Sequence, residues 1–341
     1  MTLSNIFFGK KVVKQAYLNN ALIYQSKGWE TLPSTCTETW TKSYDKADAV
    51  CSVAKDDSDN LYVSSNNSVY KIDSEGNLKW EYVISDATTT TSIVVFPTYI
   101  YCAYSASYNF GYVAKIDTNG NLISTAGVHD LTPDSSYYFF DDMQKDSNNI
   151  YAITHSHLLK LNQDLKVIDD VDISSAAHGC NAECIAINNG PYIFVGTSNY
   201  GFRLDKSNFK NSISLPEYSF LFSTDSIAMD NIGNLYLGSS TQKGPIKYDA
   251  ENCQAIKILS LNYNYALCLD NQENVYFVMH SDTYRLAKYS SDGTEIWETN
   301  IPASSDHIKI VTDSNNNICV AYVDNNSKLA IKKFINLVKE N

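Results

Sequence analysis

The sequence has no apolar run as long as a secretory signal or a membrane span. A membrane-spanning helix needs about 20 consecutive apolar residues, and a signal peptide carries an apolar core behind a basic start. We therefore expect neither membrane insertion nor export by the ordinary secretory route.

Charged residues are few, and positive charge is the scarcer kind. Only 19% of residues are charged, and 26 Lys and Arg stand against 38 Asp and Glu, so the net charge is −12. Nucleic-acid binding requires clustered Lys and Arg that neutralise phosphates, so we expect no nucleic-acid partner. Residues 1–29 contain four Lys and no acid, whereas the remainder holds 22 basic and 38 acidic residues. A basic leader thus precedes an acidic body.

Metal-binding patterns are also sparse. Most of the eight cysteines stand alone in apolar runs, which is typical of small buried side chains in a reducing compartment. His178, Cys180 and Cys184 form a His-x-Cys-x3-Cys pattern, but a zinc site needs a fourth ligand or an open position, and no second half lies nearby. The sequence therefore predicts no metal and no cofactor.

An internal repeat is the strongest positive signal. Tyrosine is abundant, with 25 copies, and a polar Asp/Asn-rich turn followed by an apolar–aromatic strand recurs along the chain. The spacing is 39 to 50 residues, which fits a four-stranded blade and predicts an all-β, seven-bladed β-propeller. The equivalent positions in the seven copies are Tyr62, Tyr101, Tyr151, Phe194, Tyr236, Tyr276 and Cys319.

The seventh unit lacks an outer strand, and a matching segment occurs near the start of the chain. Glu38–Asp45 aligns with the outer strands of two other units, placing Trp40 with Trp80 and Trp297. We predict that this segment pairs with Lys328–Ile335 and closes the ring, which would leave no open sheet edge. The domains are then a hairpin module at residues 1–30 and a propeller at residues 31–341.

Two resemblances follow from these motifs. Asp230 to Tyr236 reads D-N-I-G-N-L-Y, and the repeat resembles that of NHL-like and related bacterial β-propellers. The leader, with its basic start and two short strands flanking Asn19 and Asn20, resembles leaders of virion and tail-associated proteins of phages of Gram-positive hosts. The second resemblance implies a virion protein, assembled in the host cytoplasm and anchored to other virion proteins through Lys10, Lys11, Lys14, Tyr17 and Tyr24. A plain propeller cap is the alternative role for this leader.

The loops divide between two faces of a propeller. Short Asp/Asn/Gly turns fall on one face, which we call the turn face, and their residues suit tight turns. Longer loops fall on the other face, the loop face, with all six histidines. Binding residues concentrate on such loops, and the predicted ligand-binding residues are Tyr108, Phe110, Tyr137, His155, His157, His178, Tyr200, His280 and Tyr284.

Three functions compete for this face. The first is non-catalytic recognition of a host-surface glycan or protein by tyrosine and histidine, as in a phage receptor-binding protein used for host adhesion. The second is a structural virion decoration anchored by residues 1–30. The third is a polysaccharide lyase or hydrolase, with Glu183 and Glu217 as candidate acids and His155 and His157 as a base or metal pair. We expect the first and no enzymatic activity; a homo-oligomer stays open.

Overall fold

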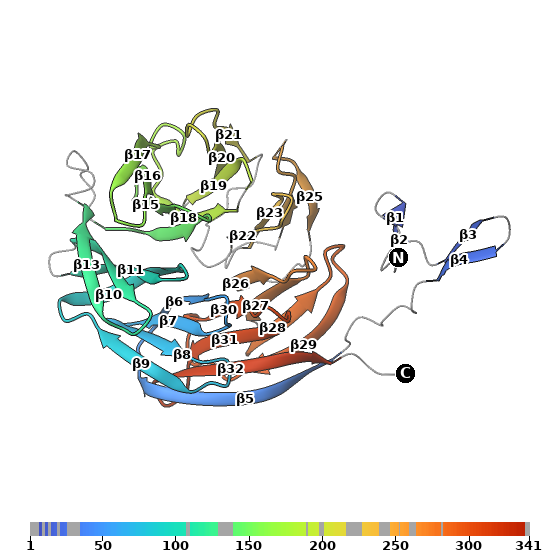
Figure 1. The fold of residues 1–341 in the computed structure, drawn as a ribbon, viewed down its shortest axis with the longest axis horizontal. Helices are drawn as coiled ribbons and strands as arrows, with labels where there is room; N and C mark the ends of the chain where they lie inside the picture. Colours follow the sequence, from blue (N-terminus) through green and yellow to red (C-terminus); the bar gives the residue numbers. More distant parts are fainter. Residues whose placement is uncertain are drawn as a thin grey trace.

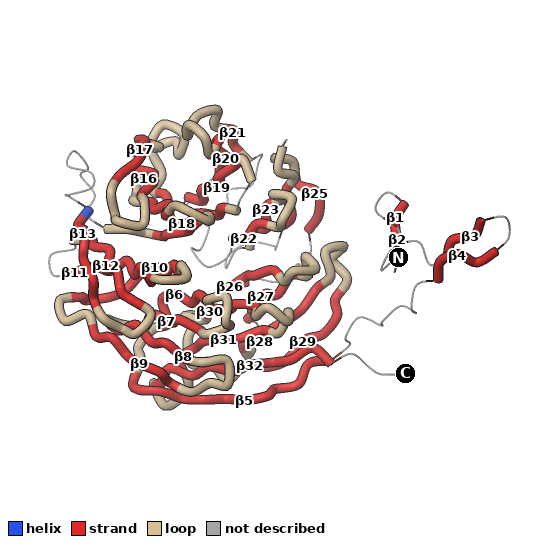
Figure 2. Tube along the Cα trace, in the orientation of Figure 1, coloured by secondary structure: helices blue, strands red, loops and turns tan. Residues whose placement is uncertain are grey.

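The computed structural model describes residues 7–8, 11–12, 15–18, 21–25, 35–106, 110–128, 139–188, 190–197, 201–215, 227–238, 246–251, 253–258, 264–280 and 282–337. Across these residues the named elements are all strands, joined by turns and loops, and Val128 at the end of β13 is the one helical position among them (Figure 2). None of these residues belongs to a helix long and apolar enough to cross a membrane.

Seven four-stranded antiparallel sheets form a ring, which confirms the predicted propeller (Figure 1). From the innermost strand outward, the first four blades are β6 (Val50–Lys55), β7 (Leu61–Ser65), β8 (Ser68–Ile72) and β9 (Leu78–Val83); β10 (Ala87–Val95), β11 (Tyr99–Ala106), β12 (Gly111–Asp117) and β13 (Leu122–Gly127); β14 (Asp142–Lys145), β15 (Ile150–Ile153), β16 (His157–Leu161) and β17 (Val167–Asp172); and β18 (Ala182–Ile187), β19 (Tyr192–Thr197), β20 (Gly201–Asp205) and β21 (Ile213–Ser214).

The last three blades continue in the same order. They are β22 (Ile227–Met229), β23 (Leu235–Leu237), β24 (Ile246–Tyr248) and β25 (Ala255–Ile258); β26 (Asn264–Leu269), β27 (Val275–His280), β28 (Tyr284–Tyr289) and β29 (Glu295–Ile301); and β30 (Lys309–Thr312), β31 (Ile318–Val323), β32 (Lys328–Leu337) and β5 (Thr35–Lys46). The first strands of neighbouring blades contact one another all the way round, so they enclose a central channel.

The ring closes as the sequence predicts. Strand β5 pairs antiparallel with β32, with Trp40 opposite Lys333, and extends a few residues beyond the expected segment at its start. The Trp40 indole N–H donates to the main-chain oxygen of Ser74 in the first blade at 3.3 Å. The outer edge of the last blade is therefore covered by the N-terminal side of the chain.

A repeated Asp–Asn–Tyr–Lys cluster explains the turn sequence. The Asp270 carboxylate accepts the backbone and side-chain N–H groups of Asn274 at 2.9 and 2.8 Å and the Tyr276 hydroxyl at 3.2 Å. The Lys288 ammonium lies 3.3 Å from the same carboxylate. Asp230 in the preceding blade is arranged in the same way, so the carboxylate satisfies a tight turn and a buried tyrosine together.

The N-terminal segment contains two hairpin-like pairs. Strand β1 (Phe7–Phe8) pairs with β2 (Lys11–Val12), and β3 (Gln15–Leu18) pairs with β4 (Ala21–Gln25). The second pair flanks the predicted turn, although residues 19 and 20 lie outside the described residues. Lys10 and Lys14 also lie outside them, and Lys11, Tyr17 and Tyr24 are placed only as members of strands. Their anchoring role and the division at residue 30 stay predictions.

Candidate functional site

The first strands of several blades carry a β-bulge where they reach the loop face. The register shifts between Val50 and Ser52, Thr90 and Ser92, Ala182 and Cys184, and Asn264 and Ala266. A bulge leaves one residue unpaired and turns its side chain in a new direction, and bulges are common beside functional sites. The residues at these bulges are Cys51, Thr91, Glu183 and Tyr265.

Asp141 occupies the same repeat position as Glu183. Gln144 pairs with Tyr151, and Ala186 pairs with Phe194. Asp141 and Glu183 each lie three residues before these first-strand partners. Neighbouring blades therefore place two carboxyl groups at equivalent points of the channel rim.

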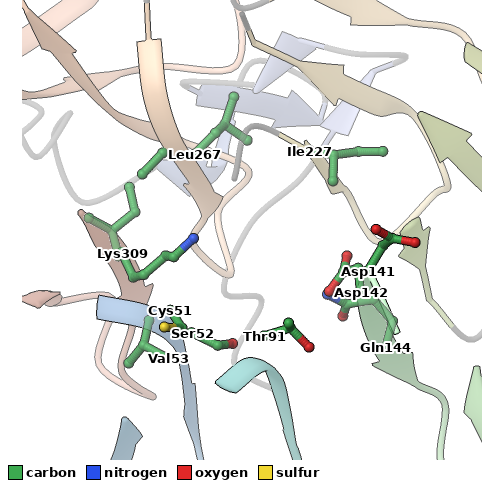
Figure 3. A pocket seen from close by; sticks show the side chains of 12 residues that line it. Cys51, Ser52, Val53, Thr91, Asp141, Asp142, Gln144, Ile227, Leu267 and Lys309 are labelled. Atoms are coloured by element: carbon green, nitrogen blue, oxygen red, sulfur yellow. The ribbon is translucent and has the colours of Figure 1, made fainter. Parts of the chain in front are cut away.

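A polar cavity of about 140 Å³ lies in the channel at this level. Lys309 reaches from one side, and Asp141, Asp142 and Gln144 stand on the other (Figure 3). First strands of six blades contribute to the lining, which consists of Cys51, Ser52, Val53, Thr91, Asp141, Asp142, Gln144, Ile227, Ala266, Leu267, Lys309 and Ile310.

A His–Asp pair stands at the rim of this cavity. The Nδ1 atom of His155 lies 2.9 Å from Oδ2 of Asp141, and the two side chains are only 18% and 12% exposed. The Phe139 ring packs edge-on against the imidazole, with 4.7 Å between ring centroids. With the Nδ1 proton held by the carboxylate, the neutral ring carries its lone pair on Nε2.

The pair is fixed by the backbone on both sides. The Asp141 N–H donates to the Ile153 oxygen at 2.9 Å, and the Ala182 N–H donates to the His155 oxygen at 3.0 Å. The loop after β15 is thus tied both to its own first strand and to that of the next blade. Such constraints hold a side-chain constellation in a fixed geometry.

The pKa values of His155, Asp141 and Glu183 are all shifted from their ordinary values. The hydrogen bond that His155 donates to the Asp141 carboxylate raises the pKa of His155 above its ordinary value, although burial opposes this shift. Burial raises the pKa of Asp141, and burial together with the charge of Asp141 raises the pKa of Glu183. Shifted carboxyl and imidazole groups that share a cavity rim are typical of acid–base sites.

Asp142 lies deeper and joins three blades. Its carboxylate accepts the Ile185 N–H at 3.1 Å, the Ser92 hydroxyl at 2.9 Å and the Met143 N–H at 2.7 Å. Burial nevertheless raises the pKa of Asp142 to about 7, against these hydrogen bonds and the charge of Lys309. Asp142 therefore takes up a proton near neutral pH, immediately below the rim pair.

Among the described residues, His157 and Cys184 have contacts of their own. His157 pairs with Asp170 of β17 at 2.9 Å, so His155 and His157 have different carboxylate partners. Cys184 is fully buried in an apolar cluster, whereas His178 is exposed in a turn. Among the described residues no group of three or more His, Cys, Asp or Glu side chains could hold a metal ion.

The remaining predictions divide into two sets. Phe110 is exposed beside β12, and His280 and Tyr284 pack with Tyr265 at the loop-face end of the sixth blade. Tyr108, Tyr137, Tyr200 and Glu217 lie outside the described residues.

Asp141 was missed by the sequence reasoning. Extending the repeat alignment by three residues would have found it, because it places Asp141 beside Glu183 in register.

The comparisons with known proteins establish the fold. No protein-family model matches the sequence, and no curated protein is similar to it. Virginiamycin B lyase from Staphylococcus aureus superimposes with a TM-score of 0.68 at 12% identity, covering 87% of this chain and 99% of the lyase. A catalytically inactive His-to-Ala variant of that enzyme with quinupristin gives a TM-score of 0.67 at 11% identity, covering 87% of this chain and 99% of the variant. The Pan2 WD40 domain of Neurospora crassa gives a TM-score of 0.69 at 9% identity, covering 91% of this chain and 97% of that domain.

These neighbours correct one expectation. The sequence reasoning predicted no enzymatic activity, and that prediction is wrong as drawn, because the solved structures with this fold include an enzyme. At such low identity the likeness shows the fold alone. The resemblances to NHL-like repeats and to phage leaders stay predictions.

Proposed function

We propose that the rim of the central channel is an acid–base catalytic site that cleaves its substrate by elimination. The observation that carries the proposal is the Asp141–His155 pair beside Glu183, at the mouth of a polar cavity. A general base needs a neutral imidazole with a defined tautomer, and a general acid needs a raised carboxyl pKa. The three groups meet both needs.

Each group has a distinct role in this reaction. His155 Nε2 removes a proton from the carbon next to a carbonyl, and the electron pair forms a carbon–carbon double bond as the C–O bond beyond it breaks. Glu183 protonates the departing oxygen. Asp141 is a positioning residue that stabilises the imidazolium, and Lys309, across the cavity, stabilises the negative charge that develops on the carbonyl oxygen. The lyases among the structural neighbours support this reaction class by analogy.

The experiment is a turnover screen with matched variants. The purified protein is incubated with bacterial-surface polysaccharides and with quinupristin, and the products are weighed by mass spectrometry. Elimination adds no water, whereas hydrolysis does. His155→Gln and Glu183→Gln should each lower kcat by about 10²–10⁴-fold.

His157→Gln is the control, because His157 forms an equivalent pair with Asp170 on the outer strand of the same blade, away from the cavity. An equal loss in the control, or products that contain added water, would contradict the proposal.

The leader suggests where such an activity would be used. Its resemblance to phage tail leaders supports a virion protein whose loop face meets a host-surface saccharide. Deletion of residues 1–30 should then abolish incorporation into the particle and leave turnover unchanged, which particle purification and the same screen would measure.

A further inference from the structure

A second cluster on the loop face uses the same repeat positions as the His–Asp pair. His155 lies four residues after Tyr151, and His280 lies four residues after Tyr276, its equivalent in the sixth blade. The first-strand position that holds Asp141 in the third blade holds Tyr265 in the sixth. The propeller thus repeats one site geometry with aromatic side chains in place of the carboxylate.

Three rings pack together at this point. The centroids of His280 and Tyr284 are 4.3 Å apart, and Tyr265 meets them edge-on at 6.2 and 5.9 Å. His280 and Tyr284 are a directly paired cross-strand couple of β27 and β28, and the bulge in β26 presents Tyr265. All three rings are half-buried, so each keeps part of its surface in solvent. We call these three residues the aromatic cluster.

The cluster borders the proposed catalytic cavity. Ala266 and Leu267, which directly follow Tyr265, line that cavity. The exposed Asp306 lies close to Tyr284: burial raises the pKa of Tyr284, and the charge of Asp306 raises it further. The rim therefore carries, within one blade and the loop that leaves it, three packed rings and a carboxylate acceptor.

We propose that the aromatic cluster and Asp306 bind a neutral sugar ring, so that the substrate of the rim site is a saccharide in which this ring neighbours a uronic acid. The carboxyl group of the uronic acid supplies the carbonyl that the elimination requires. This inference rests on the proposed function for its link to catalysis. A sugar presents an apolar C–H face that stacks on aromatic rings, and hydroxyl groups that donate to a carboxylate. The rings touch one another, which leaves no space between them for a caged cation. Asp306 and the net charge of −12 disfavour an acidic ring at this subsite.

The test separates binding from turnover. The His155→Gln protein, which should bind without cleaving, is applied to a printed array of neutral and acidic oligosaccharides, and the best neutral ligand is titrated by NMR. Tyr284→Ala and Tyr265→Ala should each weaken its binding at least about tenfold, which corresponds to about 1.4 kcal/mol. Asp306→Asn, an exposed change that leaves the fold intact, should weaken it severalfold.

Two controls define the outcome. Tyr284→Phe keeps the ring and should retain most of the affinity, and Ile168→Ala removes an exposed apolar side chain of the outer strand β17 and should change nothing. A silent array, binding only to saccharides that lack a neutral ring, or binding that survives Tyr284→Ala overturns the saccharide subsite. Sugar binding without turnover by the unmodified protein would instead overturn the proposed function and leave the subsite standing.

Discussion

Gly120 faces the indole of Trp80 so closely that a Cβ atom on it would lie 2.9 Å from Cδ2 of the ring. Trp80 stands on the outer strand of the first blade, and Gly120 lies in the last turn of the second blade with a φ of +89°. The Trp80 indole N–H donates to the Thr118 oxygen at 3.0 Å in the same turn. Trp40 and Gly76 repeat the arrangement at the junction where the ring closes.

Where the tryptophan is missing, the turn supplies the large group. Ser124 takes the position of Trp80 in the second blade, and the next turn carries Leu165, 5% exposed, in place of the glycine. Asp169 takes that position in the third blade, and the following turn carries Phe209, 4% exposed. Each of these junctions therefore holds one large side chain, contributed from one side or the other.

This relationship predicts a compensating pair of substitutions. Gly120→Leu alone should lower the free energy of unfolding by about 2–3 kcal/mol, because the side chain collides with Trp80 and the residue has a positive φ. In a Trp80→Ser background the same change should cost at least about 1 kcal/mol less. Urea unfolding of the four proteins measures the coupling.

Gly233→Leu is the control, since a Cβ there would meet only Ala250, at 3.4 Å. Additive effects at Trp80 and Gly120 would show that the junction is not a shared space.

Ring closure predicts opposite results for two truncations. Removal of residues 1–30 leaves β5 intact and should yield a monomer with an unchanged melting temperature. Removal of residues 1–46 exposes the outer edge of β32, whose main-chain groups pair with β5 along its length, and should cause aggregation. Light scattering and thermal unfolding distinguish the two, and a stable monomer from the longer truncation would refute closure by β5.

The fold could be predicted from the sequence because its determinants are local and repeated. Most blades carry a turn carboxylate, a buried aromatic residue and a strand period, and all three appear in the chain as patterns, as at Asp230, Asn234 and Tyr236. The closing strand was predictable for the same reason, since Trp40 matches the tryptophans of other outer strands. Seven copies of one pattern outweigh the irregularity of any single copy.

The site was only partly predictable, because it depends on residues that depart from the repeat in individual blades. His155 and Glu183 could be nominated from loop position, but their meeting with Asp141 requires the contact between neighbouring first strands. The sequence also did not reveal that His155 and His157 pair with two different carboxylates. Their spacing suggests a shared side, whereas the turn before β16 sends the two rings in different directions.

The rim pair predicts a specific pH dependence. Because Asp141 raises the pKa of His155, the imidazole should become neutral, and the elimination should accelerate, only above the ordinary histidine range near pH 6.5. Asp141→Asn keeps an acceptor but removes the charge, so the pKa of His155 should fall and the acidic limb of kcat/KM should move to lower pH. NMR titration of the His155 ring checks the shift without requiring turnover. An unmoved His155 pKa would show that Asp141 does not control the ring.

Asp142 and Asp313 predict opposite slopes of stability with pH. The folded-state pKa of Asp142 is about 7, above its unfolded value of about 3.9, so the folded protein holds this proton more tightly. The contribution of Asp142 is therefore fully present below about pH 4 and declines as pH rises to about 7. Asp313 is also buried, but hydrogen bonds from Lys333 and Asn317 lower its pKa. Its contribution is present above about pH 4 and is lost as pH falls through the lowered pKa.

Asp142→Asn should accordingly flatten the decline in stability between pH 4 and 7, whereas Asp313→Asn should flatten only the acid limb below it. Urea unfolding across this range measures both slopes. Each variant replaces the carboxyl group by an amide of the same shape. A change common to both variants would therefore mean that packing, not proton binding, sets the pH profile of stability.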